Sequence, residues 1–246
     1  MTLDLLVPEW GAPATVRAAC SLRSGGVSAP PFASLNLGMH VGDAPEAVAE
    51  NRRRVGAALS LPREPWWLVQ AHGTRVANAD TESVPSPADA AVTREPGRVL
   101  AIQVADCMPV LFASDDGGVV AAAHAGWRGL AAGVLESTVA AMQCDPRRLC
   151  AWLGPAISAP HFEVGAEVRA AFMTQDALAG EAFTGNARGR WYCDLLLLAH
   201  RRLAALGVGG VSAANICTYA QAERCFSYRR DGRTGRMAAL IWRTGA

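Results

Sequence analysis

The stretch Val99 to Ala113, VLAIQVADCMPVLFA, is long, apolar and β-branched in places, and it is the most informative part of the sequence. It is followed by Asp115-Asp116-Gly117-Gly118 and then by a second apolar run, Val119 to Ala123. Aspartate followed by glycine is a turn signal, and apolar runs on both sides of it are typical of paired strands. The sequence therefore predicts an antiparallel hairpin at the centre of the chain.

The expected register of this hairpin brings a cysteine and a histidine to one face of the sheet. If Ser114 pairs with Val119, antiparallel counting sets Cys107 diagonally across from His124, and both side chains point to the same side. A loop one residue longer or shorter would reverse this relation, and Pro109 indicates a local bend. The spacing makes a shared metal ion compatible with Cys107 and His124 without requiring one.

Helices and strands surround the hairpin without a regular strand–helix–strand rhythm. A helix is predicted over Pro45 to Leu61, with Asp43 as its N-cap, and another over Leu130 to Met142. The apolar run Met237 to Trp242 predicts a closing strand. Glycine and proline are spread along the chain as punctuation. The predicted fold class is therefore mixed α/β, or α+β, in a single domain over residues 1–246.

Composition and charge exclude several classes of partner. The 23 basic and 22 acidic residues leave a net charge of +1, too little to attract nucleic acid or an anionic membrane. No uninterrupted apolar segment is long enough to span a bilayer, and Asp4 and Glu9 interrupt any secretory signal at the N-terminus. The seven cysteines are scattered without CxxC spacing, which favours reduced side chains in a cytoplasmic protein.

Three residues with metal-ligating side chains also have ordinary structural explanations. Cysteine is among the most buried residue types, so Cys107 in an apolar strand reads first as a core residue. His124 can cap the helix that follows it, and His72 can be an exposed turn residue. Their intervals match no general metal-binding pattern. The residues alone therefore leave a shared site open.

Three motifs resemble those of one protein family: Gln70-Ala71-His72-Gly73, Ala105-Asp106-Cys107-Met108-Pro109 and His124-Ala125-Gly126-Trp127-Arg128-Gly129. The likeness runs nearly end to end and in order, through Ser24 to Ser28, Ser34 to Gly38, Glu50-Asn51-Arg52, Leu153 to Ile157, Phe226 to Arg230 and Thr234-Gly235-Arg236. The sequence is similar to the YfiH family, also called the laccase-domain or polyphenol-oxidoreductase family, which includes the peptidoglycan editing factor. A small departure is Ala71, where the family usually has valine.

The resemblance implies a zinc ion bound by His72, Cys107 and His124. It also implies a mixed α/β fold with sheets between helical layers, similar to the deamidating domain of cytotoxic necrotizing factor. Three protein ligands leave the fourth tetrahedral position of zinc open, as in catalytic zinc sites. Water in that position reaches a pKa of about 7. Copper can replace zinc in such a donor set.

Characterised relatives act on purine nucleosides, so the resemblance implies a small-molecule nucleoside and phosphate as substrates. The implied reaction is phosphorolysis of adenosine, inosine, guanosine or methylthioadenosine to the base and a sugar 1-phosphate, with adenosine deamination as a second activity. Water activated by zinc suits deamination directly, whereas phosphorolysis needs an anion site. No feature of the sequence indicates an oligomeric state.

Four further residues are expected near the site. Arg128 lies at the predicted start of a helix, where backbone N–H groups favour anions, and Arg23 precedes the Ser24-Gly25-Gly26 turn. Either arginine can contact phosphate or form a surface salt bridge. Asp106 can act in catalysis or be a buried hydrogen-bonding carboxylate. Asn36 is a candidate contact either to the substrate or to the residues that bind it.

The number of histidines argues against the mechanism of a multicopper laccase. Such an oxidase needs a blue-copper site and a trinuclear cluster, hence roughly ten histidines, whereas this chain has five and no His-x-His pair. Two other classes stay open. One is a cysteine hydrolase or amidase that edits peptidoglycan precursors, with Cys107 as nucleophile and His124 as base. The other is a non-enzymatic binding module in which zinc is structural.

Overall fold

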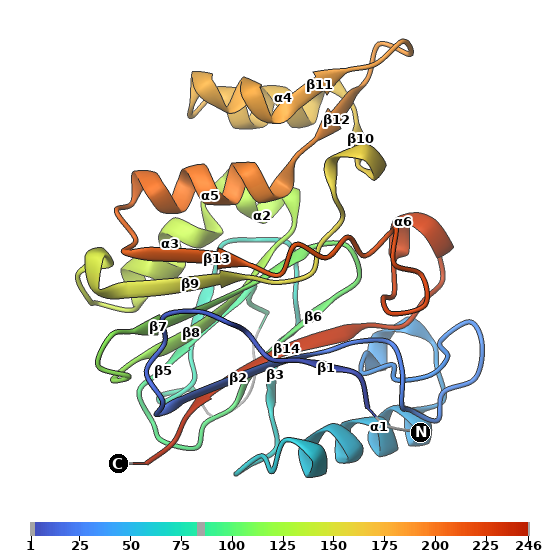
Figure 1. Cartoon of the computed structure of the whole chain (residues 1–246), viewed down its shortest axis with the longest axis vertical. Coiled ribbons are helices and arrows are strands. Elements are labelled where there is room, and N and C mark those ends of the chain that lie inside the picture. The colour runs from blue at the N-terminus through green and yellow to red at the C-terminus, as the bar shows by residue number, and fades with distance from the viewer. Residues whose placement is uncertain (1–2, 83–86, 246) are drawn as a thin grey trace.

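A computed structural model describes residues 3–82 and 87–245 of the chain. Two sheets lie face to face between helical layers (Figure 1). The first sheet has the strand order β13-β9-β7-β8-β5-β4, formed by Gly210–Ala213, Leu149–Leu153, Met108–Ser114, Val120–Ala125, Ala90–Thr93 and Val76–Asn78. The second has the order β1-β2-β14-β6-β3, formed by Leu5–Leu6, Val16–Ser21, Met237–Arg243, Leu100–Val104 and Trp66–Trp67.

Helices cover the outer faces of both sheets (Figure 1). Those over the first sheet are α2 (Trp127–Ala132), α3 (Val134–Ala141) and α5 (Leu195–Ala205), and α1 (Pro45–Ala58) lies under the second. An outermost layer holds α4 (Ala166–Met173) and a small sheet of β10 (Glu163–Val164), β12 (Trp191–Cys193) and β11 (Phe183–Gly185). The short helix α6 (Tyr228–Asp231) precedes β14. Short 3₁₀-helices are η1 (Met39–Val41), η2 (Pro146–Arg148), η3 (Ala159–His161) and η4 (Ala177–Ala182).

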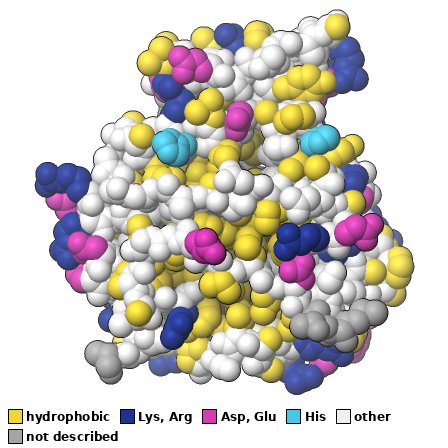
Figure 2. Space-filling view, in the orientation of Figure 1, with side chains coloured by type: hydrophobic (Ala, Val, Ile, Leu, Met, Phe, Trp, Pro, Cys, Tyr) yellow, Lys and Arg dark blue, Asp and Glu magenta, His cyan; other side chains and the backbone are white. Residues whose placement is uncertain are grey.

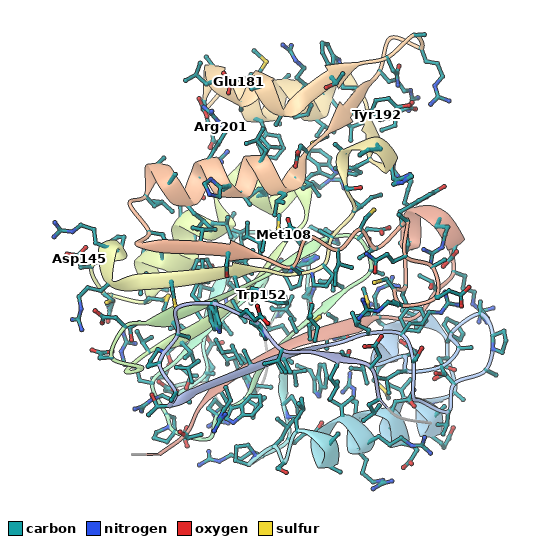
Figure 3. All side chains as sticks on the ribbon, viewed as in Figure 1. Met108, Asp145, Trp152, Glu181, Tyr192 and Arg201 are labelled. Carbon is teal, nitrogen blue, oxygen red and sulfur yellow. The ribbon has the colours of Figure 1, made fainter. Side chains whose placement is uncertain are left out.

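Both faces of the central strands are buried, which explains their continuous apolar sequence. In β7, Val110 and Phe112 pack toward the helices, whereas Leu111 and Ala113 pack against the second sheet. Trp152 of β9 also lies between the sheets (Figure 3). The mixed fold class predicted from the sequence is confirmed by this arrangement.

The predicted helix over residues 130–142 is divided into α2 and α3. Gly133 lies between them with a φ of 101°, in the left-handed region that ends helices. Its N–H still bonds to the carbonyl of Gly129 at 3.0 Å, so the glycine closes α2 before α3 begins. The prediction of one continuous helix was wrong because the apolar spacing persists across this break.

The first helix begins at Pro45 as predicted, but Asp43 does not cap it. The N-cap residue is Ala44, which has no capping side chain. The Asp43 carboxylate instead accepts hydrogen bonds from Oγ of Ser28 at 2.6 Å and Nδ2 of Asn36 at 2.9 Å. Asp43 therefore ties two loops together.

The outer surface agrees with the small net charge. Charged side chains of both signs are interspersed over the face shown in Figure 2. Arg201 of α5 points toward Glu181 of the outermost layer (Figure 3), with 3.2 Å between Nη1 and Oε2. Of the helices that the structure describes, none combines the length and apolar character needed to cross a membrane.

Candidate metal centre

The β7–β8 hairpin brings Cys107 next to His124. Met108 pairs with Ala125 and Pro109 with His124, which is the register obtained by pairing residues 114 and 119, as predicted. Cys107 lies just before β7 and not within a regular strand, because Asp106 has a φ of 98° and turns the chain. The predicted register is therefore confirmed, whereas the prediction of an unbroken apolar strand through residue 107 was wrong.

The loop after β3 carries His72 to the same point. His72 has a φ of 60°, and its ring lies edge-on to that of His124, with 4.8 Å between the centroids and 73° between the planes. Its Nε2 lies 3.9 Å from Sγ of Cys107. One ligand atom from each of the three residues lies within 4.8 Å of the others. The structure thus brings together the three residues to which the family resemblance assigns zinc.

A buried carboxylate that the sequence analysis missed, Asp89, organises both histidines. Its Oδ1 accepts hydrogen bonds from Nδ1 of His124 at 2.8 Å and from the backbone N–H of His72 at 2.9 Å. Its Oδ2 accepts from the backbone N–H groups of Ala71 and Gly73, at 3.0 and 2.6 Å. Because Nδ1 of His124 donates to Asp89, Nε2 is the nitrogen left to bind a metal.

The protonation of Cys107 and His124 follows from their contact. Burial alone would raise the pKa of the Cys107 thiol, but the charges and hydrogen bonds of His124 and His72 outweigh burial and lower it to about 6. Burial would likewise lower the pKa of His124, but the Cys107 thiolate and Asp89 raise it to about 9. Near neutral pH and without metal, the two residues therefore form a thiolate–imidazolium pair. The thiolate is the form of cysteine that binds metals.

The three side chains fit a zinc ion by donor type and by spacing. Tetrahedral zinc, with bonds of about 2.1 Å to nitrogen and 2.3 Å to sulfur, places neighbouring ligand atoms about 3.5 Å apart. The separation of Cys107 Sγ and His72 Nε2, 3.9 Å, is close to this value. Gly126 leaves the necessary room, since a Cβ there would lie 2.9 Å from Sγ of Cys107. The bond from His124 to Asp89 is the support that metal-binding histidines ordinarily have.

The cluster opens onto a cleft of 820 Å³, a volume suited to a small-molecule ligand. Its apolar lining includes Trp67, Leu68 and Val69, and its polar lining includes His40, Arg52 and Arg236. None of these six was selected as a site residue from the sequence. The cleft is therefore lined by the three metal-ligating side chains and by further residues that the sequence analysis did not select.

Two predicted site residues support the cleft from behind. The buried carboxylate of Asp106 accepts hydrogen bonds from Oγ1 of Thr218 and the backbone N–H of Arg229, both at 2.6 Å. These contacts favour its hydrogen-bonding role, which fixes the turn before Cys107. Asn36 is fully buried, and its Oδ1 accepts a hydrogen bond from the backbone N–H of Arg236 at 2.8 Å. Asn36 thereby positions an arginine of the cleft.

The two arginines predicted to contact phosphate are not among the residues that line the cleft. Arg23 donates to the carbonyl groups of Ala33 and Ala222, at 2.8 and 3.0 Å. Arg128 is exposed on α2, with its guanidinium 4.5 Å from the centroid of the Trp127 ring. The structure gives both side chains a local packing role.

Comparison with known proteins identifies the family of this chain. The family model described as multi-copper polyphenol oxidoreductase laccase matches residues 17–244, and the chain belongs to this family. It is 52% identical over 239 residues to purine nucleoside phosphorylase YfiH of Escherichia coli (strain K12), covering 97% of this chain and 98% of that relative. It is 51% identical to purine nucleoside phosphorylase PA4543 of Pseudomonas aeruginosa, covering 96% and 97%.

Solved structures agree with these relatives. The structure of the Neisseria meningitidis protein NMB0706, of family DUF152, matches with a TM-score of 0.94 and 49% sequence identity. The match covers 98% of this chain and 100% of that chain. The Bacillus licheniformis hypothetical protein YfiH has a TM-score of 0.88 and 29% identity, covering 93% of each chain. The resemblance stated from the sequence motifs is therefore confirmed for the family and for the fold.

Proposed function

We propose that this protein is a zinc-dependent purine nucleoside phosphorylase with adenosine deamination as a second activity. The observation that carries the proposal is the cluster of His72, Cys107 and His124 on an 820 Å³ cleft, in a chain 52% identical to a purine nucleoside phosphorylase. One thiolate and two imidazoles suit zinc, and copper is the alternative occupant. The partners are then a nucleoside and phosphate. The free cysteines suit the reducing cytoplasm.

The cleft offers complementary surface to a purine. Trp67 and Leu68 supply flat or apolar contact, and aromatic side chains stack well on bases. Gln103 lines the same cleft and is only 8% exposed, yet among the described residues its Oε1 has no hydrogen-bond partner. A side-chain amide can accept from a purine N–H group or, after a flip, donate to a ring nitrogen. This supports a ligand that carries such groups.

Phosphorolysis breaks the bond between C1′ of the ribose and N9 of the purine. A phosphate oxygen forms the new bond to C1′, and the electron pair of the broken bond goes to the base, which takes up a proton. Bound zinc supplies a Lewis acid for this chemistry, and for replacement of the C6 amino group by water in deamination. Asp89 holds the His124 ring in the tautomer that presents Nε2, and the walls of the cleft orient the nucleoside.

The test combines metal analysis with product identification. Purified protein should contain about one zinc per chain, and adenosine with phosphate should give adenine and ribose 1-phosphate, whereas inosine would report deamination. His72→Ala should lose zinc and turnover together. His200→Ala, which removes an exposed histidine of α5, should retain both. Absence of both products from the zinc-loaded protein would overturn the proposal.

A cysteine-type hydrolase or amidase acting on peptidoglycan precursors is the second candidate. Asp89, His124 and Cys107 follow one another as carboxylate, imidazole and thiol, the order found in cysteine hydrolases. The lowered pKa of Cys107, about 6, supports a nucleophilic thiolate. This candidate is selected if metal-free protein hydrolyses an amide bond to serine in a UDP-sugar peptide precursor and Cys107→Ala does not. Hydrolysis that requires zinc would exclude it.

A further inference from the structure

Two arginines that line the cleft, Arg52 and Arg236, both form hydrogen bonds with the backbone of Leu37. Arg52 of α1 donates from Nε and Nη2 to the carbonyl of Leu37, at 3.1 and 2.9 Å. The N–H of Leu37 in turn donates to the carbonyl of Arg236 at 3.0 Å. A Cβ on the next residue, Gly38, would lie 2.8 Å from Cγ of Arg236. The two arginines are therefore held in place by contacts with Leu37 and Gly38.

Both arginines keep hydrogen-bonding capacity in reserve. In the described part of the chain, the side chain of Arg236 donates only through Nη1, to the carbonyls of Thr234 and Gly235 at 2.9 and 3.0 Å. Arg52 lies over the Trp67 ring, 3.9 Å from its centroid, and its Nη1 makes no hydrogen bond to any described residue. Arg236 can thus offer Nε and Nη2, and Arg52 can offer Nη1.

No carboxylate neutralises this pair directly. Within residues 3–82 and 87–245, neither Arg52 nor Arg236 forms an ion pair, and no acidic side chain lines the cleft. Glu64 acts on Arg52 from nearby, but its carboxylate accepts a hydrogen bond from Nε1 of Trp67 at 3.0 Å. Two half-buried guanidinium groups therefore face the cleft without an acidic partner.

Electrostatics in the cleft agree with an excess of positive charge. Burial lowers the pKa of Arg236 and of Arg52, and it outweighs the opposing charges of Cys107 and Asp106 on Arg236 and of Glu64 on Arg52. The pKa of His40 is also lowered, first by its partial burial and then by the charges of Arg236 and Arg52. The positive charges of Arg52 and Arg236 thus both reach the imidazole of His40 in the wall of the cleft. An anion bound there would relieve the repulsion.

We propose that Arg52 and Arg236 form the subsite for inorganic phosphate, with His40 on its border. The proposal rests on the phosphorylase function proposed above and replaces Arg23 and Arg128 as the predicted phosphate contacts. Planar guanidinium groups match tetrahedral oxyanions by paired N–H donors. They hold phosphate in the same cleft as the metal centre, where one of its oxygens bonds to C1′ as the base departs.

The experiment uses zinc-loaded wild-type protein and the variants Arg236→Gln and Arg52→Gln. Arg53→Gln is the matched control, because Arg53 lies on the same helix, is exposed and pairs only with Glu50. The KM for phosphate is measured at saturating inosine, and the KM for inosine at saturating phosphate. Each glutamine variant of the pair should raise the phosphate KM by about tenfold to a hundredfold, the loss expected for charge-assisted hydrogen bonds. The inosine KM should change by less than about threefold.

Variants that lose zinc or unfold are replaced by Arg236→Lys and Arg52→Lys, which keep the charge without the planar donors. These should raise the phosphate KM by less than the glutamine variants but more than Arg53→Gln. An unchanged phosphate KM in folded, zinc-loaded variants of both arginines would overturn the subsite while leaving phosphorolysis intact. A rise in the inosine KM alone would also overturn it.

Calorimetry with inorganic phosphate alone separates the subsite from the reaction. If wild-type protein binds phosphate and Arg236→Gln does not, the subsite stands even when no phosphorolysis is detected. Inosine monophosphate is the second probe. If the variants lose affinity for this nucleotide but bind inorganic phosphate as wild type does, the arginines recognise a phosphate group carried by the ligand, and the assignment to inorganic phosphate is wrong.

Discussion

Replacement of Asp89 by asparagine tests how the metal centre is held together. The carboxylate accepts four hydrogen bonds, from the N–H groups of Ala71, His72 and Gly73 and from Nδ1 of His124. Asparagine keeps one oxygen and replaces the other by NH₂, so two of the four donors lose their acceptor in either orientation. At about 1–3 kcal/mol for each buried unsatisfied group, the free energy of unfolding should fall by about 2–6 kcal/mol.

The same substitution should weaken metal binding, because the side-chain amide of asparagine is either a weaker, uncharged acceptor for Nδ1 of His124 or, after a flip, a competing donor. Loss of such a partner typically lowers metal affinity by about tenfold to a hundredfold. Urea denaturation of the metal-free protein measures the stability, and competition with a chromophoric chelator measures the zinc affinity. Asp145→Asn is the control, since Asp145 is a partly exposed cap at the edge of the molecule (Figure 3). Wild-type zinc affinity in Asp89→Asn would refute the reasoning, whatever happened to the stability.

Three further perturbations address the packing and protonation of the centre and the helix break. Gly126→Ala should remove zinc while the fold persists, because the new Cβ would lie 2.9 Å from Sγ of Cys107. Gly56→Ala is the control and should keep zinc, since its Cβ would meet no atom within 4 Å. Full metal content in both variants would contradict the steric argument. In metal-free protein, the rate of alkylation of Cys107, followed by mass spectrometry, should stay high from pH 9 to pH 7 and fall as the pH drops through about 6. The reason is that only the thiolate reacts. A rate that already falls at pH 8 would show that Cys107 has the pKa of an ordinary thiol. Gly133→Ala should lower the free energy of unfolding by about 1–2 kcal/mol, because its φ is 101°, and increased stability in thermal melts would exclude this left-handed strain.

The hairpin could be predicted from the sequence because its determinants are local. The Asp-Gly turn and the two apolar runs set the register, and the observed pairing of Pro109 with His124 follows from it. The break before Cys107 could not be predicted in this way. Asp106 is held in its left-handed conformation by Thr218 and Arg229, which lie 112 and 123 positions further along the chain. Such contacts become visible only once the sheets are stacked.

The site residues that the sequence analysis missed differ in how much signal they carry. Asp89 stands in the small apolar run Ala88 to Val92, where a carboxylate needs a buried partner, so its role had a local indication. Arg236 had none. Its place in the cleft depends on Asn36, 200 positions away, which accepts its backbone N–H. Motif matching favoured Arg128 because it adjoins His124 in sequence, although its side chain packs on Trp127.

The positions of the possible metal ligands in this chain differ from those that a multicopper oxidase, the enzyme named in the family description, would need. Among the described residues, one group of His, Cys, Asp or Glu side chains is close enough to share an ion, and it is the cluster of His72, Cys107 and His124. The other histidines are dispersed. His161 stacks on Tyr219 with 4.5 Å between ring centroids, and His40 lines the cleft beside two arginines.

A trinuclear copper cluster needs many imidazoles converging on one point, whereas in the described part of this chain the other polar groups that line the cleft of the cluster include an amide and two guanidinium groups. Gln103 offers an unpartnered amide oxygen and Arg236 offers unused N–H groups, both within the same cleft as Cys107. Under the proposed function these groups would bind a polar, partly anionic substrate, whereas a phenol to be oxidised would leave them unsatisfied. The composition of the cleft therefore favours nucleoside and phosphate chemistry at one metal over multicopper electron transfer.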